Sequence, residues 1–75
     1  MVLKIRCAQC NGKLFRYIKI GKGKILRCYK DRIMEDMCIY EGDKVGCSCG
    51  NQIGADMGKW IKMKQNSFYY SGTKN

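Results

Sequence analysis

Two short stretches decide the fold: RCAQCNGKL at residues 6–14 and GCSCGNQIG at residues 46–54. Each stretch places two cysteines close together and follows them with glycine and asparagine. A short spacer lets one tight turn aim two sulfurs at one point, and the residue after the second cysteine can take the positive φ that the turn needs. Four thiolates at about 2.3 Å make a tetrahedral metal site. The predicted ligands of one metal ion are Cys7, Cys10, Cys47 and Cys49.

The remaining two cysteines leave other ligand sets open. Only 17 residues separate Cys10 from Cys28, whereas 36 separate Cys10 from Cys47, and about 15–20 is usual in four-cysteine zinc sites. A site that uses Cys28 or Cys38 is therefore an alternative, and a chain without metal is another. Both cysteines lie in apolar runs typical of buried free thiols, which favours the site made of the two pairs.

The size of the chain explains why it would need a metal. With 75 residues, it buries only about 60% of its unfolded surface, so the core is marginal. We expect one domain over residues 1–72 and a frayed tail at 73–75. The N-terminus lacks the apolar segment of a secretory signal, and no apolar run approaches the ~18 residues of a membrane span. We therefore expect a cytoplasmic protein, whose cysteines bind metal rather than form disulfides.

The hydrophobic pattern predicts an all-β chain of short antiparallel hairpins, with one short helical turn within residues 30–37. Residues 2–6 alternate apolar and basic side chains, as a half-buried strand does. Residues 13–20 predict a second strand, and the GKGK turn at 21–24 predicts that 25–29 returns beside it as a hairpin. Further strands are predicted at 38–40, 45–47, 60–64 and 67–71, the last two as a C-terminal hairpin.

The two cysteine knuckles and their flanking strands, about half of the chain, resemble the zinc-ribbon families, and more loosely small archaeal zinc-ribbon proteins. This resemblance implies a structural zinc ion on the four paired cysteines. It also implies a role in binding nucleic acid or the transcription and translation machinery. The second pair, C-x-C, is one residue shorter than the C-x-x-C pair of these families. Iron, alone or in a cluster, is the alternative metal for four cysteines.

The charge of the chain favours a polyanionic partner. Fifteen Lys and Arg residues face six acids, for a net charge of +9, and residues 1–32 carry ten of these cations against one acid. Nucleic acid is the partner that such a balance favours. RNA is preferred over DNA because nothing in the sequence suggests a recognition helix for the major groove.

Two stretches interleave aromatic and basic residues, at residues 14–19 and 59–64. If Ile61 and Met63 face the core, Trp60 stands outside between lysines, where a base can stack on it. The competing interpretation buries this single tryptophan in the core. The tip at residues 21–24 is expected to be exposed and to contact phosphate. The predicted nucleic-acid contacts are Arg16, Lys19, Lys22, Lys24, Arg27, Trp60, Lys62 and Lys64.

Other classes of function are less favoured. The chain has no histidine, which removes the usual general base, and a closed four-cysteine site leaves no open metal position. We therefore predict that it is not an enzyme. The alternative function is a protein-interaction module that docks on an acidic partner or on itself. We expect a monomer or a weak homodimer, since exposed strand edges can pair.

Overall fold

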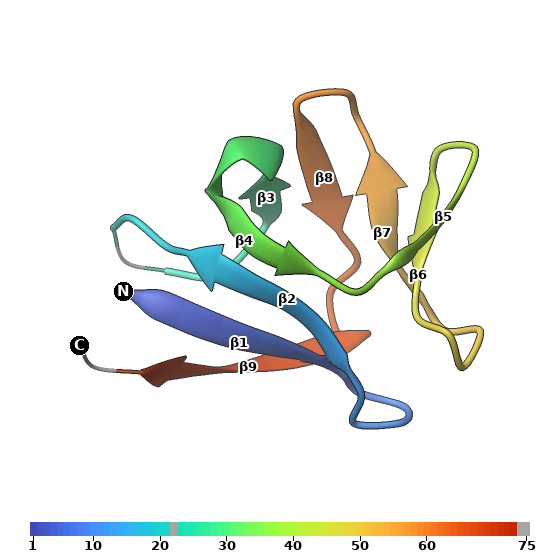
Figure 1. Ribbon diagram of the computed structural model, residues 1–75, viewed down its shortest axis with the longest axis horizontal. Helices are drawn as coiled ribbons and strands as arrows, with labels where there is room; N and C mark the ends of the chain where they lie inside the picture. Colours follow the sequence, from blue (N-terminus) through green and yellow to red (C-terminus); the bar gives the residue numbers. More distant parts are fainter. Residues whose placement is uncertain (22, 74–75) are drawn as a thin grey trace.

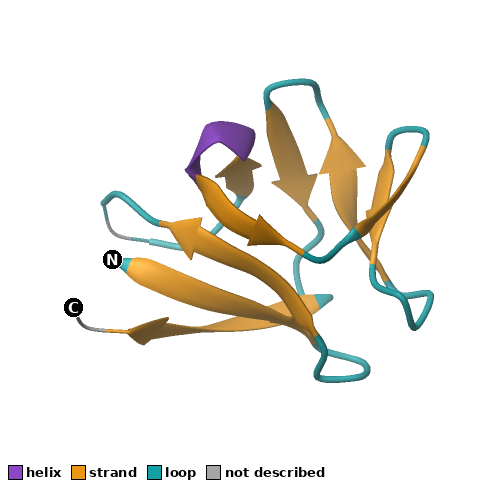
Figure 2. Cartoon of the chain, in the orientation of Figure 1, coloured by secondary structure: helices purple, strands orange, loops and turns teal. Residues whose placement is uncertain are grey.

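The computed structural model describes residues 1–21 and 23–73 and shows two antiparallel sheets of short strands (Figures 1 and 2). The first sheet has the order β4-β2-β1-β9 and comprises β1 (Val2–Cys7), β2 (Lys13–Ile18), β4 (Ile33–Asp36) and β9 (Phe68–Thr73). The second has the order β3-β8-β7-β6-β5 and comprises β3 (Arg27–Tyr29), β5 (Ile39–Glu41), β6 (Lys44–Gly46), β7 (Gln52–Asp56) and β8 (Trp60–Met63). The predicted all-β class is confirmed.

One 3-10 turn, η1 (Lys30–Arg32), joins β3 to β4. The sequence predicted helical structure up to residue 37, but residues 33–36 form β4 instead. Pairing with β2 and packing of Ile33 against the core outweigh the weak helical preference of so short a segment. Among the described residues, no helix is long or apolar enough to cross a lipid bilayer.

The core is made by the facing sides of the two sheets. In β1, Leu3, Ile5 and Cys7 are buried and alternate with partly exposed residues, as the pleat requires. The first sheet also contributes Leu14 and the second contributes Ile53, and both are fully buried. All of these side chains belong to one cluster, so the two sheets share a single apolar interior.

The predicted hairpin of residues 13–20 with 25–29 is wrong. β2 lies between β1 and β4, so both of its edges are already paired, and β3 pairs with β8 in the second sheet. Tyr29 of β3 still meets β2, because its backbone N–H donates to the hydroxyl of Tyr17 at 3.0 Å. The chain between β2 and β3 therefore passes from one sheet to the other rather than turning within one.

The predicted C-terminal hairpin is also wrong. β8 pairs with β7 and β3, whereas β9 pairs with β1 from Val2↔Thr73 to Cys7↔Phe68. The turn before β9 changes sheets: Asn66 has a φ of 69°, and the buried Ser67 hydroxyl donates to the Ile53 carbonyl at 3.3 Å. Thr73, expected in a frayed tail, lies in β9, and residues 74 and 75 lie outside the described residues.

A substitution at Gly54 in β7 tests how closely the strands of the second sheet pack. A Cβ there would lie 2.4 Å from the Lys62 carbonyl oxygen and 3.0 Å from a methyl group of Ile61. Gly54→Ala should therefore lower the free energy of unfolding by about 1–3 kcal/mol, measured by denaturant unfolding. Ala55→Ser, at the next and less buried position, is the control and should change it by less than about 0.5 kcal/mol. Equal effects of the two substitutions would contradict the close approach of β7 and β8.

Candidate metal centre

The four paired cysteines lie on two turns that belong to different sheets. Cys7 ends β1 and Cys10 lies in the turn to β2, whereas Cys47 and Cys49 lie in the turn between β6 and β7. Figure 1 shows these two turns at the same end of the molecule. The site therefore joins the first sheet to the second.

The first turn is closed by two backbone hydrogen bonds at Cys7. Its N–H donates to the Gly12 carbonyl and its carbonyl accepts from the Asn11 N–H, both at 2.9 Å. Asn11, directly after Cys10, has a φ of 64°, a conformation that asparagine tolerates better than most residues. The turn can then return the chain into β2 while both sulfurs point the same way.

The second turn repeats this arrangement with one residue fewer. The N–H of Cys47 donates to the Asn51 carbonyl and its carbonyl accepts from the Gly50 N–H, again both at 2.9 Å. Gly50, directly after Cys49, has a φ of 97°, which glycine adopts without steric cost. The shorter C-x-C pair therefore forms the same kind of knuckle.

The four sulfurs have the spacing of a tetrahedral metal site. Their Sγ atoms all lie within 4.8 Å of one another, with Cys7 and Cys49 at 3.7 Å and Cys10 and Cys47 at 3.4 Å. Metal–sulfur bonds of about 2.3 Å place tetrahedral ligands about 3.8 Å apart, whereas a disulfide needs about 2.05 Å. The four cysteines predicted from the sequence are thus positioned to hold one metal ion.

Hydrogen bonds support the negative charge that a thiolate carries. The Sγ of Cys7 accepts from the Gln9 N–H and from the Asn51 side-chain amide, both at 3.4 Å. The same amide donates to the Ser67 carbonyl at 3.0 Å, which fixes its orientation. Gly12 leaves room beside the sulfurs, since a Cβ there would make a tight contact of 3.2 Å with the Sγ of Cys10.

These contacts affect the pKa values of the ligands in opposite directions. Burial raises the pKa of Cys7, but hydrogen bonds from Asn51 and from backbone N–H groups outweigh it and lower the pKa to about 6. A hydrogen bond from the Gly12 backbone lowers the pKa of Cys10, but the neighbouring sulfurs of Cys47 and Cys49 raise it to about 12. Thiolates crowded in this way repel one another, and a divalent cation would remove that cost.

Cys28 and Cys38 lie outside the cluster. Cys28 is fully buried in the core and Cys38 is half-buried against it. Burial raises the pKa of each thiol to about 12, so both stay protonated at neutral pH. Among the described residues, the only group positioned to hold a metal is therefore the set of two pairs.

The predicted nucleic-acid contacts fall into separate places. Lys19, Lys24 and Arg27 line one groove of about 250 Å³. The groove is completed by residues that were not predicted, namely Tyr17, Ile20, Ile25, Leu26, Tyr29 and Arg32. Arg32 could have been suspected from the charge of residues 1–32, but no local pattern places it beside Lys19. Of the residues that the structure describes, four cations and no carboxylate line this hollow, which we call the basic groove.

The other predicted contacts lie around or away from the basic groove. Lys62 pairs with Arg27 across β3 and β8, and Lys64 is exposed just beyond β8. Trp60 is half-buried, with the Arg27 guanidinium 4.5 Å from its ring centre. Arg16 is in the first sheet, where it forms an ion pair with Glu35 at 3.2 Å. Lys22 lies outside the described residues.

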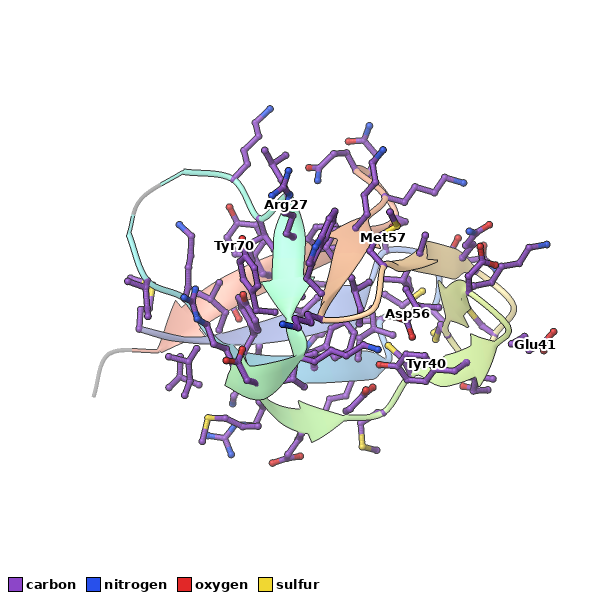
Figure 3. The ribbon with its side chains drawn as sticks, turned by 90° about the horizontal axis from the view of Figure 1, so that it is seen from above. Arg27, Tyr40, Glu41, Asp56, Met57 and Tyr70 are labelled. Atoms are coloured by element: carbon purple, nitrogen blue, oxygen red, sulfur yellow. The ribbon has the colours of Figure 1, made fainter. Side chains whose placement is uncertain are left out.

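The orientation of β8 decides between the two interpretations of its tryptophan. Ile61 and Met63 are buried, so Trp60 and Lys62 are on the outer face of the second sheet. Figure 3 shows Arg27 far from Glu41, an acid at the opposite end of this sheet. Arg27 and Lys62 are thus neighbours on the outer face at the β3–β8 end.

Comparison with known proteins assigns no family: the chain matches no family model, no curated protein and no solved structure. The structure itself shows a small all-β fold with a four-cysteine cluster that could bind a metal.

Replacing one predicted ligand should show whether the metal is held by the paired cysteines rather than by the buried ones. Cys47→Ser should abolish stoichiometric metal binding and leave the chain largely unfolded, because small domains of this type depend on their metal. Cys28→Ala is the control and should retain one metal ion per chain despite some loss of stability. Elemental analysis and circular dichroism measure the two effects. Metal retained by Cys47→Ser but lost by Cys28→Ala would overturn the assigned ligand set.

Replacing Asn51 tests whether its hydrogen bond to the Sγ of Cys7 strengthens metal binding. Asn51→Ala removes the side-chain hydrogen bond to Cys7 and should weaken metal binding by about 10–100-fold, as is typical when a hydrogen bond to a ligand is lost. Competition with a chromophoric chelator measures the affinity. Gln52→Ala is the matched control, because the Gln52 amide donates only to the Gly54 carbonyl. Equal affinities for the two variants would contradict the role given to Asn51.

Proposed function

We propose that this chain is a zinc-ribbon-like module in which one structural zinc ion stabilises the fold and whose basic groove binds single-stranded RNA. The observation that supports RNA binding is the groove itself. Its described lining includes Lys19, Lys24, Arg27 and Arg32 but no carboxylate, and it adjoins the half-buried Tyr29. Cations that meet phosphates beside an aromatic face are the usual elements of single-strand binding.

Zinc is favoured by the chemistry of the donor set. Four thiolates at tetrahedral spacing are typical of structural zinc, with iron as the competing ion. Cysteines would fill all four positions, so the ion would have no place for water or substrate. Together with the lack of histidine, this favours a binding protein over an enzyme, and elemental analysis of the natively purified protein decides between the two metals.

Single-stranded RNA fits the shape of the positive surface. The described residues contain one helical segment, the three-residue η1, which is too short to lie in a major groove as a recognition helix. The basic groove instead lies beside β3, where the chain passes from one sheet to the other. A flexible strand can follow such a surface and stack its unpaired bases on the tyrosine.

Charge reversal in the basic groove tests this function. Lys24→Glu should weaken binding of an oligouridine about tenfold or more and reduce the dependence of log K on log salt by roughly 0.7 or more. Lys44→Glu changes the net charge equally, but Lys44 is on β6, where it pairs with Glu41, and should have a much smaller effect. Fluorescence anisotropy over a salt series measures both. Equal losses would show that RNA responds to net charge alone, which would rule out the groove as the site.

A second candidate is protein docking, which exposed apolar residues favour. Met34, Met37 and Ile39 are exposed on consecutive segments of the chain, and an apolar contact surface of this kind can bind a partner. Docking through these side chains would be almost independent of salt, because it does not release counterions from phosphates. The salt series therefore also separates the two candidates.

A further inference from the structure

A second cavity beside the basic groove suggests which base the RNA presents. We propose that the cavity between Tyr29 and Trp60 binds a guanine base, with Asp31 accepting hydrogen bonds from its Watson–Crick edge. This inference rests on the proposed RNA binding and names the base that the site selects. The cavity has a volume of about 400 Å³ and is lined by Tyr29, Lys30, Asp31, Lys59 and Trp60. That volume is within the range of small-ligand pockets.

The two aromatic rings are set in place by the sheet and by cations. Tyr29 and Trp60 are directly opposite each other across β3 and β8, so both side chains are on the same face. The guanidinium of Arg32 lies 4.9 Å from the Tyr29 ring centre, and that of Arg27 lies 4.5 Å from the Trp60 ring centre. Each ring is thus held by a cation on one side, and a flat base can contact the apolar surface between them.

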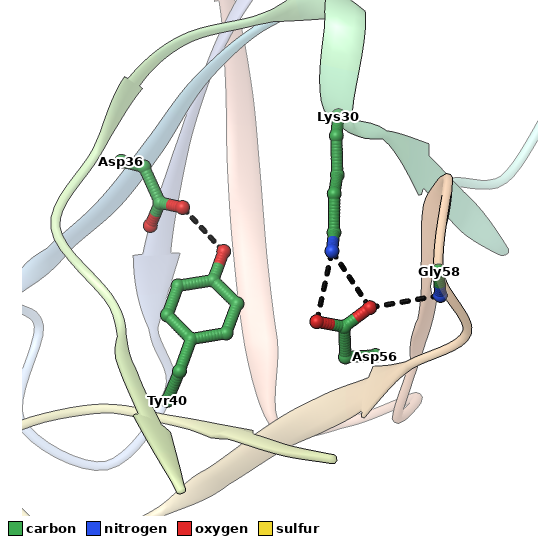
Figure 4. A network of polar contacts seen from close by, with 5 residues as sticks. All are labelled: Lys30, Asp36, Tyr40, Asp56 and Gly58. Carbon is green, nitrogen blue, oxygen red and sulfur yellow. Dashed lines mark hydrogen bonds and ion pairs between the residues drawn. The ribbon is translucent and has the colours of Figure 1, made fainter. Parts of the chain in front are cut away.

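Asp31 supplies an acceptor with no other role in the described residues. It is exposed on η1 and makes no hydrogen bond or ion pair there. Its neighbour Lys30 is already engaged by Asp56, with Nζ 2.7 Å from one carboxylate oxygen and 2.8 Å from the other (Figure 4). The negative charge of Asp31 is therefore available to a ligand.

A free carboxylate discriminates between bases because it only accepts hydrogen bonds. Guanine presents two adjacent donors on its Watson–Crick edge, the N1–H and the N2 amino group, and can bind both carboxylate oxygens. Adenine and cytosine place a ring-nitrogen acceptor beside their amino group, and uracil has one N–H between two carbonyls. The other bases would therefore turn at least one acceptor toward Asp31, which costs binding energy.

The cavity and the basic groove share a wall. Tyr29 lines both, so a base in the cavity leaves its phosphates near Arg27 and Arg32. Lys59 lines the cavity as well and can meet the next phosphate along the strand. The two hollows together form a path for a single strand, with the base selected in one and the backbone bound in the other.

The test compares oligouridines that carry one central guanosine, inosine or adenosine, each titrated against the metal-loaded full chain. Anisotropy gives the affinity, and the fluorescence of the single tryptophan reports whether a base enters the cavity. Guanosine should bind at least about tenfold more tightly than adenosine, as expected for one bidentate contact. Inosine, which lacks the N2 amino group, should be intermediate. Quenching of Trp60 should follow the same order.

Asp31→Ala is the decisive variant, because an exposed residue can be replaced without loss of folding. It should reduce the guanosine-to-adenosine ratio to near one while the binding of plain oligouridine stays the same or tightens. A wild-type ratio near one, or a preference that survives Asp31→Ala, overturns the guanine site but leaves RNA binding in place. Failure of every oligonucleotide to bind overturns the proposed function and this inference with it.

Discussion

The convergence of four sulfurs from two turns is the constraint on which the rest of the structure depends. Cys7 and Cys10 lie at the turn from β1 to β2 and Cys47 and Cys49 at the turn from β6 to β7, and the opposing sulfurs lie 3.4 and 3.7 Å apart. Negative charge on neighbouring sulfurs at this distance is unfavourable and raises the pKa of Cys10 to about 12, a cost that a bound divalent cation would offset. The two sheets share one apolar core, but a chain of 75 residues has little area to bury. A metal ion held by these four cysteines would therefore add a cross-link between the two sheets to a small core.

The parts of the fold that could be predicted from the sequence are those that local geometry decides. Both knuckles were recognisable because two close cysteines and a following Asn11 or Gly50 specify a tight turn by themselves. The alternation in residues 2–6 likewise specified β1. The pairing of β3 was not recognisable, because both edges of β2 are taken by β1 and β4, which leaves β3 to pair with β8. Local turn signals at residues 21–24 say nothing about edges that distant segments occupy.

The same limit applies to the candidate site. Asn51 was noticed only as a turn residue, since its link to Ser67 joins two turns that lie 16 residues apart. Lys19, Lys24 and Arg27 were predicted contacts, and in the structure they line one groove. Arg16 was predicted with them, but in β2 it forms an ion pair with Glu35 instead. Alternation along a strand identifies which side chains share a face. Only the assembled sheets show which faces adjoin.

The cysteine cluster and the basic groove use different residues, but each joins the first sheet to the second. The groove lies where Tyr17 of the first sheet meets Tyr29 of the second, through the hydrogen bond between the Tyr17 hydroxyl and the Tyr29 N–H. The distance between the groove's walls therefore depends on the distance between the two sheets. A metal ion on the four cysteines would hold that spacing from the turns between β1 and β2 and between β6 and β7. Under the proposed function, a metal ion on these cysteines that itself contacts no RNA would thus help to keep the groove in shape.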